Sequence, residues 1–376
     1  MRFSTPTTLL REAIGIAGSA VPSKTTLPIL DSIFFERDGD RLRLTSTDLE
    51  ISVVKHVSVM FGGSGTAKTR RIAVPAAKLQ ETLRKLPDVP LTFHADENFA
   101  VTLRTETGMY KMLGFDGADY PALPDMKEGT VIYTDSASMR RALQKTGFAV
   151  SKDLLRPAMS GIYFQIDTDG TRVVASDGHR LVRLSLHKLT SSAAVSFILP
   201  YRAMGIVGRG AEDGPCTITF DGNYVSFDFT DLRILSRRID ETYPNYEAVI
   251  PLDNNRRMTV NRQALISSAL RVGLYSSKST QQIRMRIAKN TMTVSAEDIE
   301  RSSEAKEEVS CEHSGEDYLI GFNGPSLTEA LKVLDSEHVL FDFGSPKHAG
   351  VLKPLEQQAG EEIMMLVMPV RLSTYA

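Results

Sequence analysis

A hydroxyl, a carboxylate and an imidazole stand close together near the middle of the chain, at Ser176, Asp177 and His179. These are the side-chain types of a nucleophilic triad, in which the imidazole must lie between the nucleophile and the acid. Triad partners normally come from separate chain segments, because neighbours on one turn rarely reach that geometry. The cluster follows an apolar run and contains Asp177-Gly178, a pair typical of turns. We therefore favour a recognition surface at a strand end, with a hydrolase or nucleotidyltransferase as the alternative.

A second candidate site lies at residues 62–69, where glycines precede Lys68 and Thr69 much as in a phosphate-binding loop. Ala67 replaces the glycine that should precede the lysine, and residues 70–74 have a strand pattern. A phosphate-binding loop must open a helix so that its N–H groups converge on the anion. We expect a hairpin loop here.

The composition predicts a cytoplasmic protein with no metal, no cofactor and no membrane association. The 376 residues exceed one ordinary core and carry a formal net charge of −2. No apolar run approaches the roughly 20 residues that cross a bilayer, and the N-terminus has no signal-peptide pattern. Cys216 and Cys311 lie far apart and are expected to be reduced thiols. The seven histidines are scattered and form no ligand pair.

The same order of elements recurs three times along the chain. Each copy opens with a short strand and an amphipathic helix, whose leading apolar residues are Leu9, Met139 and Leu265. An apolar strand end followed by small residues and an acid comes next, at residues 44–49, 174–178 and 294–299. A second helical pattern then follows in each copy. Three markers in one order indicate a threefold structural repeat.

We therefore expect an α+β protein built from three tandem domains, at residues 1–125, 126–252 and 253–376. Short runs of alternating apolar and polar residues, bounded by Asp-Gly and Gly-Asn turns, fill the space between the helices. Each domain is expected to contain two helices packed on antiparallel sheets of roughly eight strands.

The six expected helices are strongly basic although the whole chain is slightly acidic. Their windows hold twelve Lys and Arg residues against the acids Glu12, Glu81 and Glu329. Arg140 and Arg141 have no acidic neighbour in their window. One interpretation is that these residues lie on ordinary solvated helix faces with no binding role. The pattern favours instead a basic surface for a phosphate backbone, with no signature of base reading.

Six motifs on this repeat resemble the bacterial DNA polymerase III β subunit family, the sliding clamps, over essentially the whole chain. The motifs are Thr26-Leu27-Pro28-Ile29-Leu30, Ser46-Thr47-Asp48-Leu49-Glu50, Ser176-Asp177-Gly178-His179-Arg180-Leu181, Tyr243-Pro244-Asn245-Tyr246, Gly321-Phe322-Asn323 and Val367-Met368-Pro369-Val370-Arg371-Leu372.

The resemblance implies a head-to-tail homodimer, a ring of six DNA-clamp domains whose helices line a central channel around double-stranded DNA. Such a ring is a non-catalytic processivity factor that binds without regard to sequence. Its implied partners are the DNA polymerase III alpha subunit, the clamp loader, and other DNA polymerases and repair proteins that carry clamp-binding motifs. A specialised clamp paralogue that does not act as the main ring remains an alternative.

The resemblance also implies three sets of site residues. Partner peptides are expected in a pocket between the second and third domains, lined by Met159, Gly178, His179, Arg180, Leu181, Pro244, Ala248, Val249, Met368, Pro369, Val370 and Arg371. The residues it implies for DNA contact are Lys24, Arg84, Lys152, Arg156 and Arg202, and the charge pattern of the helices adds Arg140 and Arg141. Dimer contacts are expected at Tyr110, Met112 and Leu274. The chain departs from familiar members in its small Ala248 and Ser326 and in its tail, residues 373–376.

Overall fold

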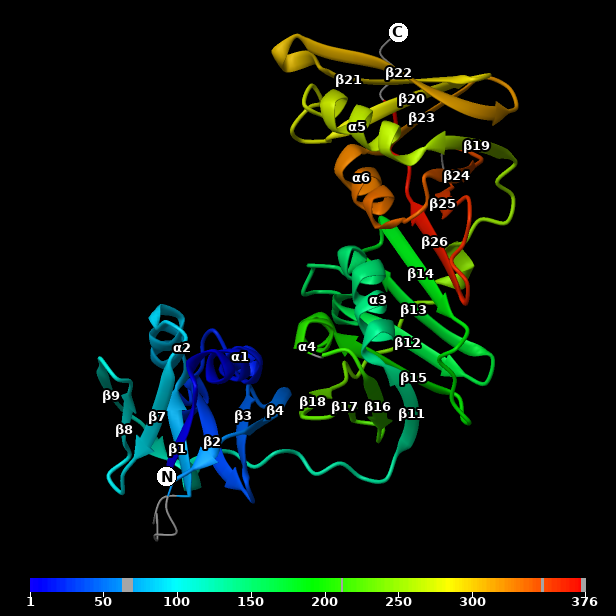
Figure 1. Cartoon of the computed structure of the whole chain (residues 1–376). Helices are drawn as coiled ribbons and strands as arrows, with labels where there is room; N and C mark the ends of the chain where they lie inside the picture. Colours follow the sequence, from blue (N-terminus) through cyan, green and yellow to red (C-terminus); the bar gives the residue numbers. More distant parts are fainter. Residues whose placement is uncertain (63–69, 211, 346–347, 373–376) are drawn as a thin grey trace. The chain divides into compact units, whose positions relative to one another are not determined.

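The computed structural model describes residues 1–62, 70–210, 212–345 and 348–372 (Figure 1). Two compact units divide the chain: Met1–Arg140 with Arg202–Arg238, and Arg141–Tyr201 with Ile239–Ala376. All six expected helices form, two in each of three tandem clamp domains, which confirms the predicted fold class. They are α1 Thr7–Ala17, α2 Ala76–Lys85, α3 Ser136–Thr146, α4 Tyr201–Gly210, α5 Arg262–Gly273 and α6 Gly324–Val333.

The first unit contains a five-stranded sheet in the order β5-β1-β7-β8-β9 and a nine-stranded sheet in the order β10-β6-β2-β3-β4-β18-β17-β16-β11. Their strands are β1 Arg2–Pro6, β2 Ser32–Asp38, β3 Arg41–Thr47, β4 Ile51–Ser58, β5 Met60–Phe61, β6 Arg71–Pro75, β7 Pro90–Ala95, β8 Ala100–Arg104, β9 Met109–Leu113, β10 Phe115–Asp116, β11 Thr130–Asp135, β16 Pro215–Phe220, β17 Tyr224–Asp228 and β18 Leu232–Arg237.

A hydrophobic core holds the helices of the N-terminal domain on these sheets. Leu10 and Ile14 of α1, Leu79 of α2 and Phe35 of β2 are fully buried in one cluster. The apolar residues of α1 recur at helical spacing, so one face is buried and the other carries polar side chains. The larger sheet runs from the N-terminal domain into the central domain through antiparallel pairing of β4 with β18.

The second unit contains a twelve-stranded sheet in the order β15-β12-β13-β14-β26-β25-β24-β19-β22-β21-β20-β23. Its strands are β12 Gly161–Asp167, β13 Gly170–Ser176, β14 Arg180–Leu186, β15 Val195–Pro200, β19 Arg256–Asn261, β20 Gln282–Ala288, β21 Thr291–Asp298, β22 Ser303–Ser314, β23 Tyr318–Asn323, β24 His338–Phe343, β25 Gly350–Pro354 and β26 Glu361–Val367.

Strands β14 and β26 join the central and C-terminal domains inside this sheet, and they lie side by side in Figure 1. They pair antiparallel over the whole of both strands, from Arg180 opposite Val367 to Leu186 opposite Glu361. Because side chains alternate between the faces of a sheet, this register decides which residues of the two strands meet. It places Leu181 directly opposite Leu366.

Within the described residues the central and C-terminal domains have eight strands each, as expected, and the N-terminal domain gains the two-residue pieces β5 and β10. The glycine-rich residues 63–69 lie outside the described residues, but the strands on either side of them, β5 and β6, belong to different sheets. The hairpin loop therefore stays a prediction, but the element that follows, β6, is a strand, whereas a phosphate-binding loop requires a helix there.

Candidate functional site

The polar cluster at residues 176–180 is a turn held together by its own side chains. Ser176 Oγ donates to the carbonyl of Arg180 at 2.8 Å and accepts the N–H of Gly178 at 3.1 Å. Asp177 Oδ1 accepts the N–H groups of His179 and Arg180 at 2.9 and 3.0 Å. Gly178 adopts a φ of +88°, in the left-handed region that glycine tolerates. The hydroxyl and one carboxylate oxygen thus bind the backbone of the turn, and the other carboxylate oxygen pairs with Arg180, an arrangement that disfavours a triad.

Beside this turn, on the face of the β13–β14–β26 sheet, lies a cavity of about 270 Å³, which we call the apolar pocket. Its lining comes from segments far apart in the sequence, brought together by strand pairing and by the 243–249 segment. The lining residues are Met159, Ser176, Gly178, His179, Arg180, Leu181, Tyr243, Pro244, Asn245, Tyr246, Val249, Ala349, Leu366 and Met368. Val249 is 59% exposed and Met368 is 40% exposed, so apolar side chains face solvent at the rim.

Two tyrosines that line the apolar pocket, Tyr243 and Tyr246, pack against a third, Tyr163. The rings of Tyr163 and Tyr243 stack with their centres 4.8 Å apart, and Tyr246 meets Tyr163 edge to face. The Tyr246 hydroxyl donates to Gln165 Oε1 at 3.1 Å and also lies 3.4 Å from a carboxylate oxygen of Glu247. Burial, reinforced by the Glu247 charge, raises the pKa of Tyr246 to about 12. The Tyr246 hydroxyl is therefore protonated at physiological pH and can donate its hydrogen bond.

Arg180 lines the apolar pocket, and neighbouring carboxylates already neutralise its charge. It pairs with Asp177 at 3.1 Å and with Glu329 of α6. It also donates to the carbonyl of Phe148 at 2.8 Å, and its guanidinium lies 5.2 Å from the Phe148 ring centre. Since acceptors within the chain occupy most of its N–H donors, Arg180 is not a free cation for a ligand.

The structure brings together eight of the twelve residues predicted for this pocket: Met159, Gly178, His179, Arg180, Leu181, Pro244, Val249 and Met368. Ala248, Pro369, Val370 and Arg371 do not line the cavity. The chain after Met368 runs along β23 instead, where Pro369 bridges Phe322 and the Val370 N–H donates to Gly321 at 2.9 Å. The C-terminal segment thus turns away from the cavity three residues earlier than expected, after Met368 and not after Arg371.

Six lining residues were missed: Ser176, Tyr243, Asn245, Tyr246, Ala349 and Leu366. Two signals in the sequence were available for some of them. Tyr243, Asn245 and Tyr246 belong to the same motif as the predicted Pro244. Leu366 precedes Met368 by two positions, so the alternation of a strand places them on one face. Ala349 gives no local signal.

Two residues expected on a DNA surface, Arg141 and Arg202, have their charges engaged within the fold. Arg141 pairs with Asp335 at 2.6 Å and with Glu361, to which its Nε donates at 2.9 Å. Arg202 pairs with Asp48 and donates to the carbonyls of Ser19 and Val21, both at 3.1 Å. Each links one domain of the chain to the next, and we do not keep either in the proposed DNA-binding set.

The remaining cations of that set lie on the surface of their own units. Arg140 forms an ion pair with Asp213, a side chain that is 89% exposed. Lys24, Arg84 and Lys152 are exposed. Arg156 pairs with Asp153 at 3.2 Å, and a Cβ added at Gly178 would lie 3.0 Å from its guanidinium. Arg156 therefore also borders the apolar pocket.

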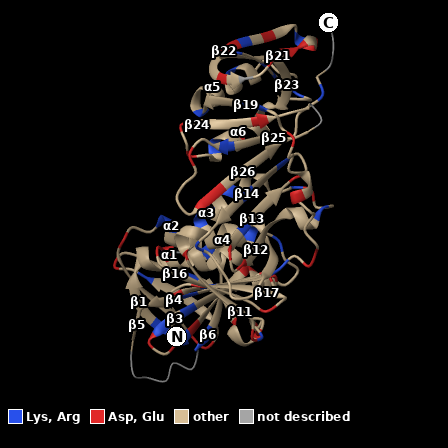
Figure 2. Ribbon diagram, turned by 90° about the vertical axis from the view of Figure 1, so that its right-hand side faces the viewer, with Lys and Arg blue, Asp and Glu red and all other residues tan. Residues whose placement is uncertain are grey.

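The residues predicted for the dimer contact lie at exposed edges. Tyr110 and Met112 belong to β9, which pairs only with β8 within the described residues. Leu274 follows α5 and is 82% exposed. A further open edge is the first part of β22, which pairs with β21 on one side only; Figure 2 shows charges of both signs along these strands. Unpaired edges of this kind invite pairing with a second chain.

Neither a metal centre nor a membrane span is found in the part of the chain that the structure describes. No group of three or more His, Cys, Asp or Glu side chains there could hold a metal ion. No helix there is both long enough and apolar enough to cross a bilayer.

Two helices on antiparallel sheets, repeated three times along one chain, define a clamp fold. Models of the DNA polymerase III beta subunit match residues 1–124 as its N-terminal domain, 134–245 as its central domain and 247–371 as its C-terminal domain. The chain belongs to the DNA polymerase III beta subunit family.

Curated proteins and solved structures are similar to this chain over almost its whole length. A beta sliding clamp of Synechococcus elongatus is 28% identical, over 96% of this chain and 97% of its own. One of Pseudomonas putida is 25% identical, over 99% and 100%. Among solved structures, the Pseudomonas aeruginosa sliding clamp bound to griselimycin superposes with a TM-score of 0.91, and the Thermotoga maritima beta subunit with 0.90. Both are 25% identical and cover 99% of this chain and 100% of their own.

Proposed function

We propose that the chain is a DNA sliding clamp, a non-catalytic processivity factor that acts in the cytoplasm. The observation that carries this proposal is the full-length agreement, domain by domain, with proteins named beta sliding clamp. We retain the bounds 1–125, 126–252 and 253–376 for its three domains as part of the proposal. A closed ring would hold double-stranded DNA without regard to sequence and raise the concentration of a bound polymerase at the primer end.

The apolar pocket is the proposed docking site for partner peptides. The partners are the DNA polymerase III alpha subunit, the clamp loader, and other DNA polymerases and repair proteins that carry a short apolar motif. An opening lined by Val249, Met368 and the buried tyrosines suits large apolar anchors, which supply most of the affinity in such sites.

For DNA contact we keep Lys24, Arg84, Arg140, Lys152 and Arg156. Their contribution is electrostatic and therefore falls as the salt concentration rises. For the homodimer we propose that β9, with Tyr110 and Met112, meets the open edge of β22 and Leu274 in the second copy. Strand β22 carries Glu304 and Glu308 beside Lys306, and its Glu307 is already paired with Arg271, whereas β9 carries Lys111, so the two edges remain complementary in charge.

A topological experiment tests this function. Purified chain is loaded onto singly primed circular DNA by a clamp loader and separated from free protein by gel filtration. We expect retention on the circle, release after a restriction enzyme linearises it, and long products when the polymerase is added. A solution mass near twice 41.4 kDa is expected as well. A strict monomer, or equal retention on linear DNA, would contradict the ring.

The two alternative functions predict different results. A specialised paralogue would bind replication proteins but fail to tether the polymerase on circular DNA. An enzyme using the Ser176–His179 cluster would show metal-dependent turnover of a phosphodiester or ester substrate that His179→Ala abolishes. That second alternative is disfavoured by the hydrogen bonds that commit Ser176 and Asp177 to the turn.

A further inference from the structure

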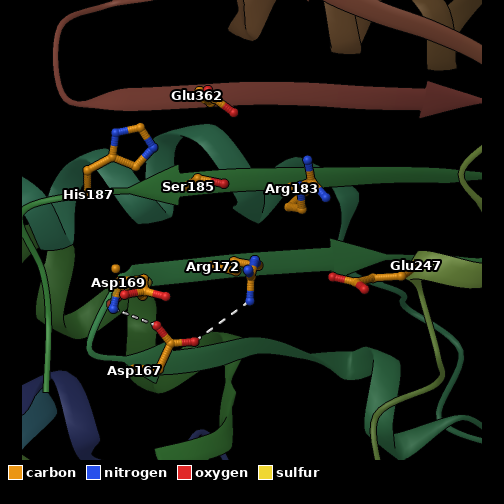
Figure 3. Close-up of a pocket in the computed structure, with 10 residues that line it drawn as sticks. Asp167, Asp169, Arg172, Arg183, Ser185, His187, Glu247 and Glu362 are labelled. Atoms are coloured by element: carbon orange, nitrogen blue, oxygen red, sulfur yellow. Dashed lines mark hydrogen bonds and ion pairs between the residues drawn. The ribbon is translucent and has the colours of Figure 1, made fainter. Parts of the chain in front are cut away.

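The sheet face that carries the apolar pocket carries a second cavity, also of about 270 Å³, which we call the charged pocket (Figure 3). It is lined by Asp167, Asp169, Gly170, Thr171, Arg172, Arg183, Ser185, His187, Glu247 and Glu362. We propose that Arg183 in this pocket binds an acidic side chain of the partner peptide whose apolar anchors occupy the apolar pocket. The inference rests on the partner-binding role proposed above and names a chemical feature of those partners.

The two pockets are neighbours because of strand register. Ser176 pairs with Leu181, Val174 with Arg183 and Arg172 with Ser185, so these side chains share one face of β13 and β14. Leu181 lines the apolar pocket, and Arg183, two residues further along β14, lines the charged pocket. At 3.3–3.4 Å per residue, their backbones lie about 7 Å apart.

A single chain segment marks the border between the pockets. Tyr246 lines the apolar pocket, and the next residue, Glu247, lines the charged pocket. Tyr246 is buried while Glu247 is exposed, so a peptide would cross over this segment. Crossing from one cavity to the other takes about two residues of extended peptide, given its rise per residue, and a third lets the peptide pass over the exposed Glu247.

Arg183 is the cation that remains available on this face. Of the arginines that line either pocket, Arg180 is paired with two carboxylates and Arg172 lies 3.8 Å from Asp167. Arg183 is half-buried and has no ion pair or hydrogen bond from its guanidinium among the described residues. Figure 3 shows its side chain next to that of Arg172, with Glu247 at one end of the cavity and His187 at the other. A half-buried guanidinium without a counter-ion favours an anionic partner.

The surrounding acidic side chains determine which kind of anion Arg183 can bind. Asp167, Asp169, Glu247 and Glu362 outnumber the two arginines, so a free anion meets a repulsive rim. A carboxylate carried by an anchored peptide is held at high effective concentration and can reach Arg183 despite that rim. The charges therefore favour a peptide side chain over free phosphate.

The test measures binding of labelled ten-residue peptides to the full-length chain by fluorescence anisotropy. Each peptide has two adjacent large apolar residues and either Glu or Gln three residues away, on the N-terminal or the C-terminal side. We expect one Glu peptide to bind about fivefold more tightly than its Gln counterpart at low salt, since half-exposed charge pairs contribute about that much. The advantage should shrink as salt is added.

Variants assign the effect to one side chain. Arg183→Met should remove the Glu advantage while leaving the affinity of the Gln peptide unchanged, which also shows that the sheet still folds. Arg183→Lys should retain part of the advantage. Arg286→Met is the matched control, because Arg286 is exposed on β20 and has no hydrogen-bond or ion-pair partner among the described residues.

Three outcomes would overturn the inference. Equal binding of Glu and Gln peptides, or an advantage that survives Arg183→Met, would remove Arg183 from recognition while leaving the apolar pocket in place. Loss of the advantage on adding millimolar inorganic phosphate would make the site a general anion site. Failure of every peptide to bind a dimeric chain would overturn the partner site itself, and this inference with it.

Discussion

Arg141 of helix α3 donates through its Nε to Glu361, the first residue of β26, across 2.9 Å. The same guanidinium lies 2.6 Å from Asp335, which also accepts from Lys145 at 2.7 Å. The side chains of Lys145 and Glu361 are only 5% and 10% exposed. This network fastens the central domain to the C-terminal domain by side chains, beside the backbone pairing of β14 with β26.

Removing one carboxylate of this network should destabilise the unit that contains it. Glu361→Gln leaves Arg141 with Asp335 alone and places an amide against a half-buried guanidinium. We expect the free energy of unfolding to fall by about 1–3 kcal/mol, as for other buried charge-assisted hydrogen bonds. Urea denaturation followed by circular dichroism measures the change.

The neighbouring acid supplies the control. Glu362 is exposed and makes no ion pair within the described residues, so Glu362→Gln should change the free energy of unfolding by less than about 0.5 kcal/mol. Equal effects of the two substitutions would show that the network contributes nothing specific.

The network also predicts how stability depends on pH. Burial by itself would raise the pKa of Asp335, but hydrogen bonds from Lys145 and Arg141 outweigh it and hold the pKa below the ordinary 3.8. Its contribution is therefore complete above pH 3.8 and is lost as pH falls through the lower folded-state pKa. The stability difference between wild type and Asp335→Asn should shrink over that window. A difference that stays constant down to the acid transition would contradict this assignment.

The two residues that follow β26, Met368 and Pro369, should differ sharply in their effect on peptide binding. Met368 lines the apolar pocket, whereas Pro369 bridges to Phe322 and does not. We expect Met368→Ala to weaken a bound apolar peptide about tenfold, because it removes contact area worth about 1.4 kcal/mol. Pro369→Ala should stay within about twofold. A larger effect at Pro369 would mean that the peptide follows the C-terminal segment along β23.

The proposed dimer contact can be tested at one exposed leucine. Leu274 is 82% exposed, and a carboxylate there would be buried in the proposed contact without a partner. Leu274→Asp should shift the solution mass from dimer to monomer in analytical ultracentrifugation. Leu252 is 98% exposed and lies outside the proposed contact, so Leu252→Asp should leave the dimer intact. Dissociation by both variants would argue against the assigned surface.

The helices were predictable from the sequence because their signals are local. Helix α5, for example, begins where Asn261 caps Ala264 at 2.9 Å, and its buried Leu265, Ala269 and Val272 recur at helical spacing. The threefold repeat strengthens these assignments, since the helical patterns and one strand-end marker recur in each copy.

The charge on the helices could not be judged in the same way. Arg141 has no acid in its own helix, yet Glu361 lies against it from 220 positions away. Pairing of strands brings such acids close, and no window of the sequence contains both partners. The pocket shows the same limit: Gly178 and Leu181 were found through their motif, but Ala349 lines the cavity only because β25 pairs with β26.

The pairing of β14 with β26 also makes the apolar pocket depend on the end of the chain. Leu181 on one wall faces Leu366 on the next strand, and Met368 completes the rim. A polypeptide still emerging from the ribosome, or one clipped before its last strand, lacks these residues even when its earlier strands are already paired. The apolar wall around Leu181 therefore forms only once β26 is in place beside β14.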